Sequence, residues 1–412
     1  MHDQRPFDVV VFGATGFVGQ LVCRALLHQS QQEAFQWAIA GRSASKLAAL
    51  TEMLTHEQCH VPYIVADAHN DTSLKTVCLQ TRVVISTVGP YALYGDTLVK
   101  VCAETGTHYC DLTGESQWIR RMIDQHHSQA VQSGAYLVHC CGFDSIPSDL
   151  GVFYLQSQAQ ERWHEPCERV KMRLVAAQGG ISGGTIASGL NIVKEAAEDE
   201  RLRQALQSPY FLCPESEPVK THPPTLIPVQ YDEEFAAWVT PFVMAEVNTR
   251  IVLRSNYLQD YAYGKAFCYE EGIVVQDGPL GWLAAQGLKY SLDGLILATT
   301  VAPLRALLKA ALFPKAGEGP SAEAQAQGFY DLQLVGKTAD AKSLTVQVSG
   351  DRDPGYGSTS KLIAQAGLCL AKDLSPQAKP GGSWTPASLM GTPLLNRLQK
   401  YAGVTFHPTF RS

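Results

Sequence analysis

Short apolar runs alternate with longer amphipathic segments through residues 1–150. The amphipathic segments, such as 19–28 and 116–133, place apolar residues at helical spacing. This alternation predicts an α/β domain of the Rossmann type, a doubly wound parallel sheet with helices on both faces. The expected strands are 7–12, 37–40, 61–66, 83–88, 107–112 and 135–140.

The pattern changes after residue 150, and residues 151–354 are expected to form a second domain of the α+β type. Helices are expected at 185–205 and 280–313, with a long loop at 208–228, which is rich in Pro, Glu and Ser. Helical patterns also cover 356–371 and 388–402. Strands are expected at 170–176, 263–270, 329–335 and 343–348.

The composition is that of a globular protein without a nucleic-acid partner. Of 412 residues, 45% are hydrophobic and 17% are charged, and the formal net charge is -6. No block of Lys or Arg supplies the clustered cations that phosphate backbones require. The first residues lack the layout of a signal peptide, and the 11 cysteines form no C-x-x-C pair. We therefore expect a cytoplasmic protein with reduced thiols and no metal site.

The stretch Gly13-Ala14-Thr15-Gly16-Phe17-Val18-Gly19 is the most informative part of the chain. It follows a predicted strand and opens a predicted helix, with a G-x-x-G-x-x-G spacing. Gly13 allows a tight turn, Gly16 lets a pyrophosphate approach the backbone, and Gly19 allows close packing. The helix N-terminus offers N–H groups and a positive dipole end to phosphates. The pattern predicts a dinucleotide-binding loop.

The end of the second strand predicts NADP(H) rather than NAD(H). NAD enzymes usually place Asp or Glu there for the ribose 2′-hydroxyl, whereas this chain has Arg42, with Ser43 and Lys46 close behind. A guanidinium can chelate a 2′-phosphate that a carboxylate would repel. Asp67, after the third strand, suits contact with the adenine edge, although it can equally cap the next helix.

Polar residues follow the later strands and are candidates for the nicotinamide edge and the substrate. Thr87-Val88-Gly89-Pro90-Tyr91 follows the fourth strand, Asp111 to Glu115 follow the fifth, and Asp144 and Ser145 follow the sixth. Parallel sheets bind ligands at these carboxyl ends, so the residues are expected to face a common pocket. Helix capping and turn formation remain alternatives for each of them.

Taken together, several motifs resemble the saccharopine dehydrogenase-like oxidoreductases, and most closely the trans-acting enoyl reductase branch. The resemblance implies NADP(H), hydride transfer to an unsaturated bond, and a second, substrate-binding and dimerisation domain. It also implies that residues 355–412 return to the first domain. The motifs are Gly13–Gly19, Ala40–Ser43, Thr87–Tyr91, Tyr109–Glu115, Cys141–Pro147, Ser182–Thr185, Pro241–Ala245, Arg254–Asn256, Gly317–Pro320, Gly350–Tyr356 and Leu389–Gly391.

The favoured hypothesis is NADPH-dependent reduction of an enoyl-type double bond in a lipid or polyketide-like small molecule. Tyr91, Asp144 and Ser145 are the candidate catalytic residues. Reduction of an amino-acid imine is an alternative, and it would need cations for the substrate carboxylates. The second domain offers Arg173, Arg250 and Arg254 for that purpose. A catalytically silent NADP-binding protein is a third alternative, and in each case we expect a homodimer.

The most apolar stretch, residues 294–313, bears on membrane contact. Its length approaches that of a bilayer span, but Arg305 and Lys309 lie within it. We therefore expect no transmembrane helix. Two alternatives remain, a buried helix pair, which is favoured, and a helix lying on a lipid surface in peripheral contact with a membrane.

Overall fold

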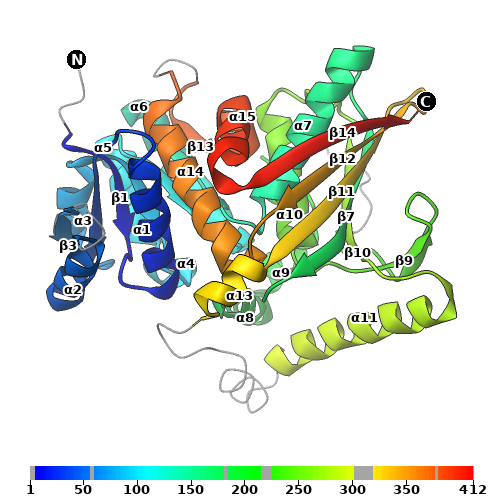
Figure 1. Cartoon of the computed structure of the whole chain (residues 1–412), viewed down its shortest axis with the longest axis horizontal. Helices are drawn as coiled ribbons and strands as arrows, with labels where there is room; N and C mark the ends of the chain where they lie inside the picture. The colour runs from blue at the N-terminus through cyan, green and yellow to red at the C-terminus, as the bar shows by residue number, and fades with distance from the viewer. Residues whose placement is uncertain are drawn as a thin grey trace. The chain divides into compact units, whose positions relative to one another are not determined.

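The computed structural model describes residues 5–55, 60–180, 183–214, 225–300, 319–375 and 379–411, and its chain divides into two compact units (Figure 1). Each unit is assembled from segments far apart in the sequence. The first unit comprises Met1–Phe143, Pro314–Ala322 and Gly355–Gly403, and the second comprises Asp144–Phe313, Glu323–Pro354 and Val404–Ser412.

The first unit is built on a seven-stranded sheet in the order β3-β2-β1-β4-β5-β6-β13. Every pairing within it is parallel. The order reverses direction between β1 and β4, which is the switch point of a doubly wound sheet, so the predicted fold class is confirmed. The strands are β1 (Phe7–Phe12), β2 (Trp37–Gly41), β3 (Tyr63–Val65), β4 (Thr81–Ser86), β5 (His108–Asp111), β6 (Tyr136–Val138) and β13 (Gly382–Trp384).

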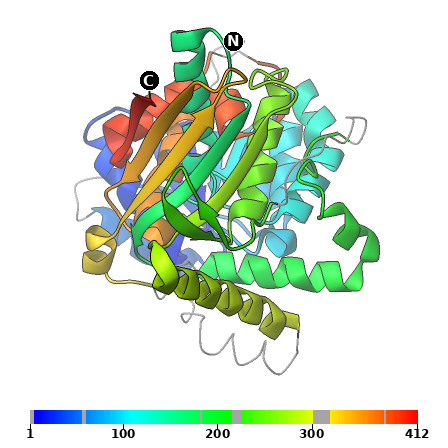
Figure 2. The same ribbon diagram turned by 90° about the vertical axis from the view of Figure 1, so that its right-hand side faces the viewer.

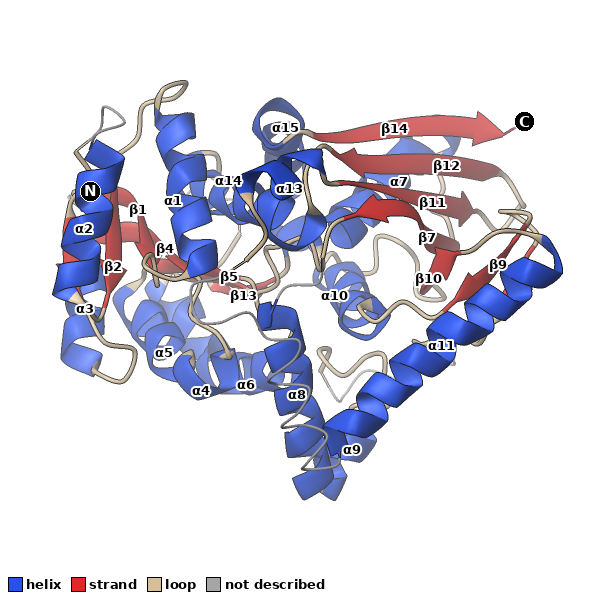
Figure 3. Cartoon of the chain, turned by 60° about the horizontal axis from the view of Figure 1, so that its bottom comes forward, coloured by secondary structure: helices blue, strands red, loops and turns tan. Residues whose placement is uncertain are grey.

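Helices cover both faces of this sheet (Figure 3). A helix from late in the chain, α14 (Thr359–Lys372), packs on β1, β4 and β5 and against α1 (Phe17–Ser30). Gly367 permits this contact, because an added Cβ would lie 2.4 Å from Ile85. The other helices are α2 (Ala44–Thr55), α3 (Asp71–Cys78), α4 (Tyr91–Tyr94), α5 (Asp96–Thr105), α6 (Ser116–Ser133) and α15 (Pro386–Arg397), and a π-helical turn, η2 (Leu398–Ala402), follows α15.

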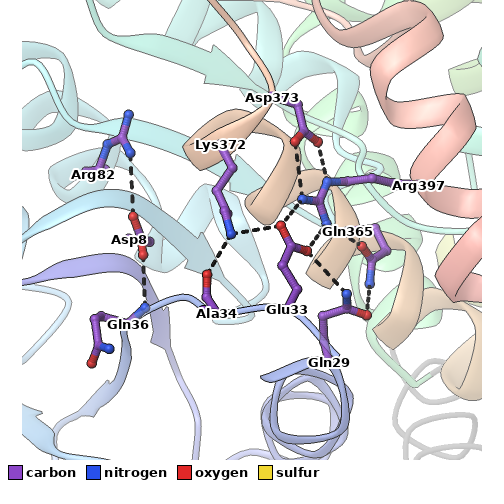
Figure 4. A network of polar contacts seen from close by, with 10 residues as sticks. All are labelled: Asp8, Gln29, Glu33, Ala34, Gln36, Arg82, Gln365, Lys372, Asp373 and Arg397. Atoms are coloured by element: carbon purple, nitrogen blue, oxygen red, sulfur yellow. Dashed lines mark hydrogen bonds and ion pairs between the residues drawn. The ribbon is translucent and has the colours of Figure 1, made fainter. Parts of the chain in front are cut away.

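A charged network links the late helices of the first unit to its N-terminal segment (Figure 4). Arg397 of α15 bonds Glu33 at 2.8 Å and also pairs with Asp373, and Lys372 contacts Glu33 at 2.8 Å. Gln365 of α14 links the same guanidinium to α1, since it accepts from Arg397 at 3.1 Å. These cations hold the pKa of Glu33 at about 2, below its usual value, despite partial burial. The network joins residues more than 300 positions apart in sequence.

The second unit is built on a seven-stranded mixed sheet in the order β14-β12-β11-β7-β10-β9-β8 (Figure 2). Only β7 and β10 pair in parallel among these strands. Alternate residues of β12 are buried, as expected for a sheet with one face on the core. The strands are β7 (Arg169–Gln178), β8 (Gln230–Asp232), β9 (Ala237–Thr240), β10 (Cys268–Val274), β11 (Phe329–Lys337), β12 (Ser343–Gly350) and β14 (Val404–Arg411).

Helix α7 (Ile146–Trp163) packs on this sheet against β11 and β12, and α10 (Ala245–Leu258) packs against β10 and α7. Helix α11 (Gly278–Thr300) packs against β9. The helix expected at 185–205 is interrupted at Asp199, whose side chain caps a new helix. The remaining elements are α8 (Gly183–Glu198), α9 (Glu200–Ala205), α13 (Ala322–Gln327) and the π-helical turn η1 (Pro354–Ser358).

Several expectations need correction. Residues 355–403 join the first unit, but β14 pairs with β12 along its whole length, so the last strand belongs to the second sheet. The strand expected at 263 begins at Cys268, because the chain turns between Tyr261 and Gly264, both of which have positive φ angles. The sequence pattern also missed α10, because most of its polar residues are buried with its apolar ones.

The apolar stretch is described only as far as residue 300, and residues 301–318, with Arg305 and Lys309, lie outside the described residues. Its expected burial is wrong for Leu297, which is 65% exposed. Within the described part of the chain, no helix is both long and apolar enough to cross a bilayer.

Candidate cofactor and active site

The glycine-rich loop joins β1 to α1 at the carboxyl edge of the first sheet. Gly13 has φ +87°, and an added Cβ would lie 2.5 Å from Val88, so this position requires glycine. At Gly19 an added Cβ would lie 2.3 Å from the carbonyl oxygen of Gly13, which explains how α1 starts so close to the turn. Valine at either position would disturb the fold, not merely a ligand.

Gly16 has more open surroundings than the other two glycines of the loop, Gly13 and Gly19. It is exposed, and an added Cβ would meet only the carbonyl of Gly13, at 3.3 Å. It is the N-cap of α1, with extended backbone and no side chain to occupy the helix N-terminus. The first N–H groups of α1 therefore face a position that holds no side chain, where an anion fits. This open cradle fits the pyrophosphate of a dinucleotide.

The phenylalanine of the loop is held by residues from late in the chain. The ring of Phe17 packs edge to face on Tyr356, with centroids 5.1 Å apart. An added Cβ at Gly319 would lie 2.3 Å from the same ring. Ala14, Thr15 and Val18 complete the loop, with Ala14 buried and the other two half-buried. Segments near 319 and 356 thus support the loop, and no local sequence pattern predicts this contact.

Basic side chains stand at the end of β2. Arg42 and Lys46 are exposed, and neither has an ion-pair partner among the described residues. The hydroxyl of Ser43 accepts the backbone N–H of Lys46 at 3.4 Å, as an N-cap of α2 does. Two cations beside a helix N-terminus fit a phosphate group. Asp67 accepts the N–H of His69 at 2.9 Å, and Asn70 rather than Asp67 caps α3.

The loop after β4 lies directly against the glycine loop. The hydroxyl of Thr87 donates to the carbonyls of Phe12 and Gly13, at 3.1 and 3.2 Å. Val88 makes the close contact with Gly13 described above, and Gly89-Pro90 leads into α4. The structure thus brings together Thr87, Val88 and Gly13, which the sequence placed in one site from separate strands.

Tyr91 is buried, and its hydroxyl is already hydrogen bonded on both sides. It donates to the carbonyl of Ser86 and accepts the N–H of Leu112, each at 3.1 Å. Burial, and then the nearby Asp111 carboxylate, raises the pKa of Tyr91 well above its usual value. The carboxylate of Glu115 accepts the N–H groups of Tyr91 and Ala92, at 2.7 and 3.2 Å. Tyr91 therefore links β4 to β5 inside the fold.

A buried histidine and carboxylate lie at the next strand ends, and sequence reasoning missed their pairing. His139 Nδ1 lies 2.7 Å from Asp111 Oδ2, and both side chains are buried. The other nitrogen, Nε2, is buried without a hydrogen-bond partner in the described structure. The rings of Trp118 and Tyr109 lie against the imidazole, with centroids 5.1 and 5.7 Å away. The sequence feature that could have pointed to this pair is a histidine directly after a buried strand.

The second unit begins with the other two candidate residues, Asp144 and Ser145. Asp144 is half-buried. Ser145 precedes α7 but does not cap it, because its hydroxyl donates to Asn248 Oδ1 at 2.8 Å. Asn248 in turn donates to Glu271 at 3.0 Å. The sequence therefore found Ser145 but not Asn248, its partner on α10.

The carboxyl group of Glu271 is fully buried in this polar network. Tyr269 donates to its Oε1 at 2.6 Å, and the charged groups of the unit compensate it only weakly. Burial raises the pKa of Glu271 to about 7, although the hydrogen bonds from Tyr269, Ser148 and Asn248 oppose the rise. Next to it, Ser255 donates to Asp149 at 2.5 Å. The network fastens α7 to α10 and β10.

The arginines of the second unit are bonded within it. Arg173 is fully buried, donates to Asp232 at 2.6 Å and also pairs with Glu270. Arg250 and Arg254 are buried as well, and each donates to a backbone carbonyl at 2.5 Å. The three side chains therefore stabilise the unit and do not form a set of open carboxylate-binding groups.

A doubly wound sheet with an open glycine cradle and exposed cations at its second strand defines a dinucleotide-binding protein of the Rossmann class. Comparisons with known proteins make this specific. Residues 9–138 match the saccharopine dehydrogenase NADP binding domain. A putative trans-acting enoyl reductase of Mycobacterium tuberculosis is 39% identical over 415 residues, covering 98% of both chains. A trans-acting enoyl reductase of Mycobacterium leprae is 35% identical and covers 99% of both chains.

The chain therefore belongs to the trans-acting enoyl reductase branch of the saccharopine dehydrogenase-like family. Its fold resembles that of apo saccharopine dehydrogenase (L-Glu forming) from Saccharomyces cerevisiae, with a TM-score of 0.51 and 13% identity, covering 98% of this chain and 100% of that one. The predicted family, an oxidoreductase that uses NADP(H), is confirmed.

Proposed function

We propose that this enzyme reduces an enoyl-type carbon–carbon double bond in a lipid or polyketide-like small molecule, with NADPH as the hydride donor. The observation that supports it most strongly is the similarity, over 98% of both chains, to a protein named as a putative trans-acting enoyl reductase. The arginines of the second unit add to this. An imine reductase acting on amino acids needs free cations for carboxylates, whereas Arg173 is already paired with Asp232 and Glu270.

We propose specific contacts for the cofactor. The backbone of Gly13–Gly19 and the N-terminus of α1 would hold the pyrophosphate, with Gly16 leaving room for it. Arg42, Ser43 and Lys46 would bind the 2′-phosphate, and Asp67 the adenine edge. Thr87, Val88, Gly89 and Pro90 would line the nicotinamide side. When bound, NADPH supplies the hydride, and the protein supplies binding and orientation.

The roles proposed for the candidate catalytic residues differ. Tyr91 is a positioning residue, because both hydrogen bonds of its hydroxyl hold β4 and β5 together. Asp144 and Ser145 are proposed to contact the substrate. The hydroxyl of Ser145 donates its only proton to Asn248 Oδ1 at 2.8 Å, so toward the substrate it would act as a hydrogen-bond acceptor and as a positioning group. A second copy of the chain is the proposed protein partner.

The chemistry is tested by following NADPH consumption with two panels, enoyl thioesters of increasing chain length and imines of amino acids. Turnover of the enoyl panel alone supports the proposal. Turnover of imines alone contradicts it, and NADPH binding without turnover in either panel indicates a non-catalytic protein. Ser145→Ala should lower kcat with unchanged NADPH affinity, whereas Ser157→Ala, at an exposed site on α7, should change neither.

The cofactor cradle is tested by Gly16→Val. Because Gly16 has φ −74° and an added Cβ would make one tight contact, at 3.3 Å with the carbonyl oxygen of Gly13, the variant should fold after a small shift of that turn and lose NADPH binding. The matched control is Gly180→Ala, since an added Cβ there meets no atom within 4 Å. A folded Gly16→Val protein that binds NADPH normally would place the phosphates elsewhere.

A further inference from the structure

The outer face of α11 presents an apolar stripe with regular spacing. The residues of this stripe, called the α11 seam below, are three and four positions apart in alternation, the spacing of a coiled-coil seam. The four large ones are strongly exposed, at 70% for Leu280, 57% for Leu283, 66% for Tyr290 and 65% for Leu297. The seam consists of Leu280, Leu283, Gly287, Tyr290, Gly294 and Leu297.

The opposite side of α11 is the side that packs on its own unit. Gly281 and Ala285 are buried there, beside β9 and the residues before α11, and α11 also packs against α8. An added Cβ at Gly281 would lie 3.2 Å from Trp238, and Thr240 donates to the carbonyl of Ala285 at 3.1 Å. Figure 3 shows α11 as a long straight helix along the margin of this unit. The seam therefore faces away from the surface that anchors the helix.

From Leu283 to Leu297, large and small residues alternate along the seam, and this order is self-complementary. Gly287 and Gly294 have open surroundings, because an added Cβ at either meets no atom within 4 Å. If two copies of α11 pack antiparallel, Leu283 faces the partner's Gly294, and Tyr290 faces the partner's Gly287. Leu280 then meets the partner's Leu297. Each glycine forms a hole for a large side chain, and the two-fold axis uses the same surface twice.

A parallel pair lacks this complementarity. It would place glycine opposite glycine and tyrosine opposite tyrosine, so that layers would alternate between empty and crowded.

A lipid surface fits the seam less well. Interfacial helices carry Lys and Arg along a polar face. The only charged residues of α11 are Lys289 and Asp293, which pair with each other at 2.5 Å, so the helix has no net positive charge. An uncharged seam of about 18 residues, roughly 27 Å long, suits another helix of the same kind.

We propose that the α11 seam is the homodimer interface, in which two copies pack α11 antiparallel about a two-fold axis between residues 288 and 289. The inference rests on the proposed dimer but not on the proposed chemistry. Sedimentation and NADPH turnover are measured separately, so either proposal can fail without the other.

Sedimentation velocity over a concentration series is the first test. The parent protein should be a dimer. Leu283→Glu would bury a charge in the seam and should raise the dissociation constant at least about 100-fold. Leu288→Glu is the matched control, because Leu288 is exposed on α11 but lies off the seam. It should remain dimeric. Circular dichroism melts establish that both variants are folded.

Cross-linking tests the direction of the helices. Oxidation of a mixture of Leu283→Cys and Gly294→Cys proteins should give the mixed dimer, whereas efficient cross-linking of Leu283→Cys with itself would indicate a parallel pair and overturn the register. A parent protein that is monomeric throughout, or a dimer that Leu283→Glu leaves intact, overturns the proposal. Binding of a monomeric parent protein to anionic vesicles, lost in Leu283→Glu, would identify a lipid surface instead and also overturn it.

Discussion

Arginine has different roles at the strand ends of the first unit and in the interior of the second. Arg42 is exposed, and no carboxylate among the described residues pairs with it. Arg173 is fully buried between Asp232 and Glu270. Water solvates the first charge until a ligand replaces that water, whereas the second must be compensated by the fold itself. An exposed cation at a strand end is thus a candidate for ligand binding, and a saturated buried one is structural.

The largest effect is expected at Arg173. Arg173→Met leaves Asp232 buried with the 3.5 Å ion pair to Lys171 and the hydrogen bond from the N–H of Glu234, so the free energy of unfolding should fall by about 4 kcal/mol. Urea unfolding of the parent and variant measures this. Arg169→Met, an exposed position on the same strand, should change stability by less than about 0.5 kcal/mol. A similar loss in both variants would contradict the contrast between buried and exposed arginines.

Glu271 tests the same contrast for a carboxyl group without a full counter-charge. Its pKa is about 7 in the folded protein, above the ordinary 4.5. The folded protein therefore retains a proton that the unfolded chain releases, and this stabilisation is present below pH 4.5 and lost as the pH rises to about 7. The loss amounts to about 3 kcal/mol.

Glu271→Gln should flatten that part of the pH dependence of unfolding. Glu168→Gln, at an exposed site, should leave it unchanged. An identical slope in the parent and Glu271→Gln proteins would show that the carboxyl group titrates elsewhere.

Tyr91 distinguishes a positioning role from a catalytic one within the first unit. Tyr91→Phe removes the hydrogen bonds to the carbonyl of Ser86 and from the N–H of Leu112, which should lower stability by about 2 kcal/mol. Because the hydroxyl is engaged in the fold, kcat at a temperature where the variant is folded should change less than about tenfold. A loss of kcat by a thousandfold in a stable variant would restore Tyr91 as a proton donor.

The smallest effect is expected at Arg42, and it concerns binding rather than folding. The parent protein should bind NADPH at least about tenfold more tightly than NADH, or about 1.4 kcal/mol. Arg42→Asp should abolish or reverse that preference while thermal stability stays unchanged. Arg24→Asp, also exposed in the first unit, should keep the preference. Equal affinities of the parent protein for both cofactors would refute the role of Arg42.

The two units also differ in how well the pattern of apolar and polar residues predicted their helices and strands. In the first, strands such as 7–12 and the helix at 116–133 were located to the residue, since short buried strands and amphipathic helices are local features. In the second, the polar residues of α10 hid a helix, because Asn248 and Ser255 are buried against Ser148 and Asp149, on an element far away in sequence. A pattern of apolar positions cannot reveal polar groups that are buried against one another.

By itself, the sequence determined the class of the first domain, the glycine loop and the arginine that indicates NADP(H), because each depends on residues within a few positions of one another. Only the tertiary structure decided which polar groups are available for chemistry. It engaged the Tyr91 hydroxyl between β4 and β5, and it paired His139 with Asp111. It placed β14 in the second sheet and left the α11 seam exposed. These outcomes depend on contacts between segments that are distant in sequence. The free energy of such contacts cannot be read from a local sequence pattern.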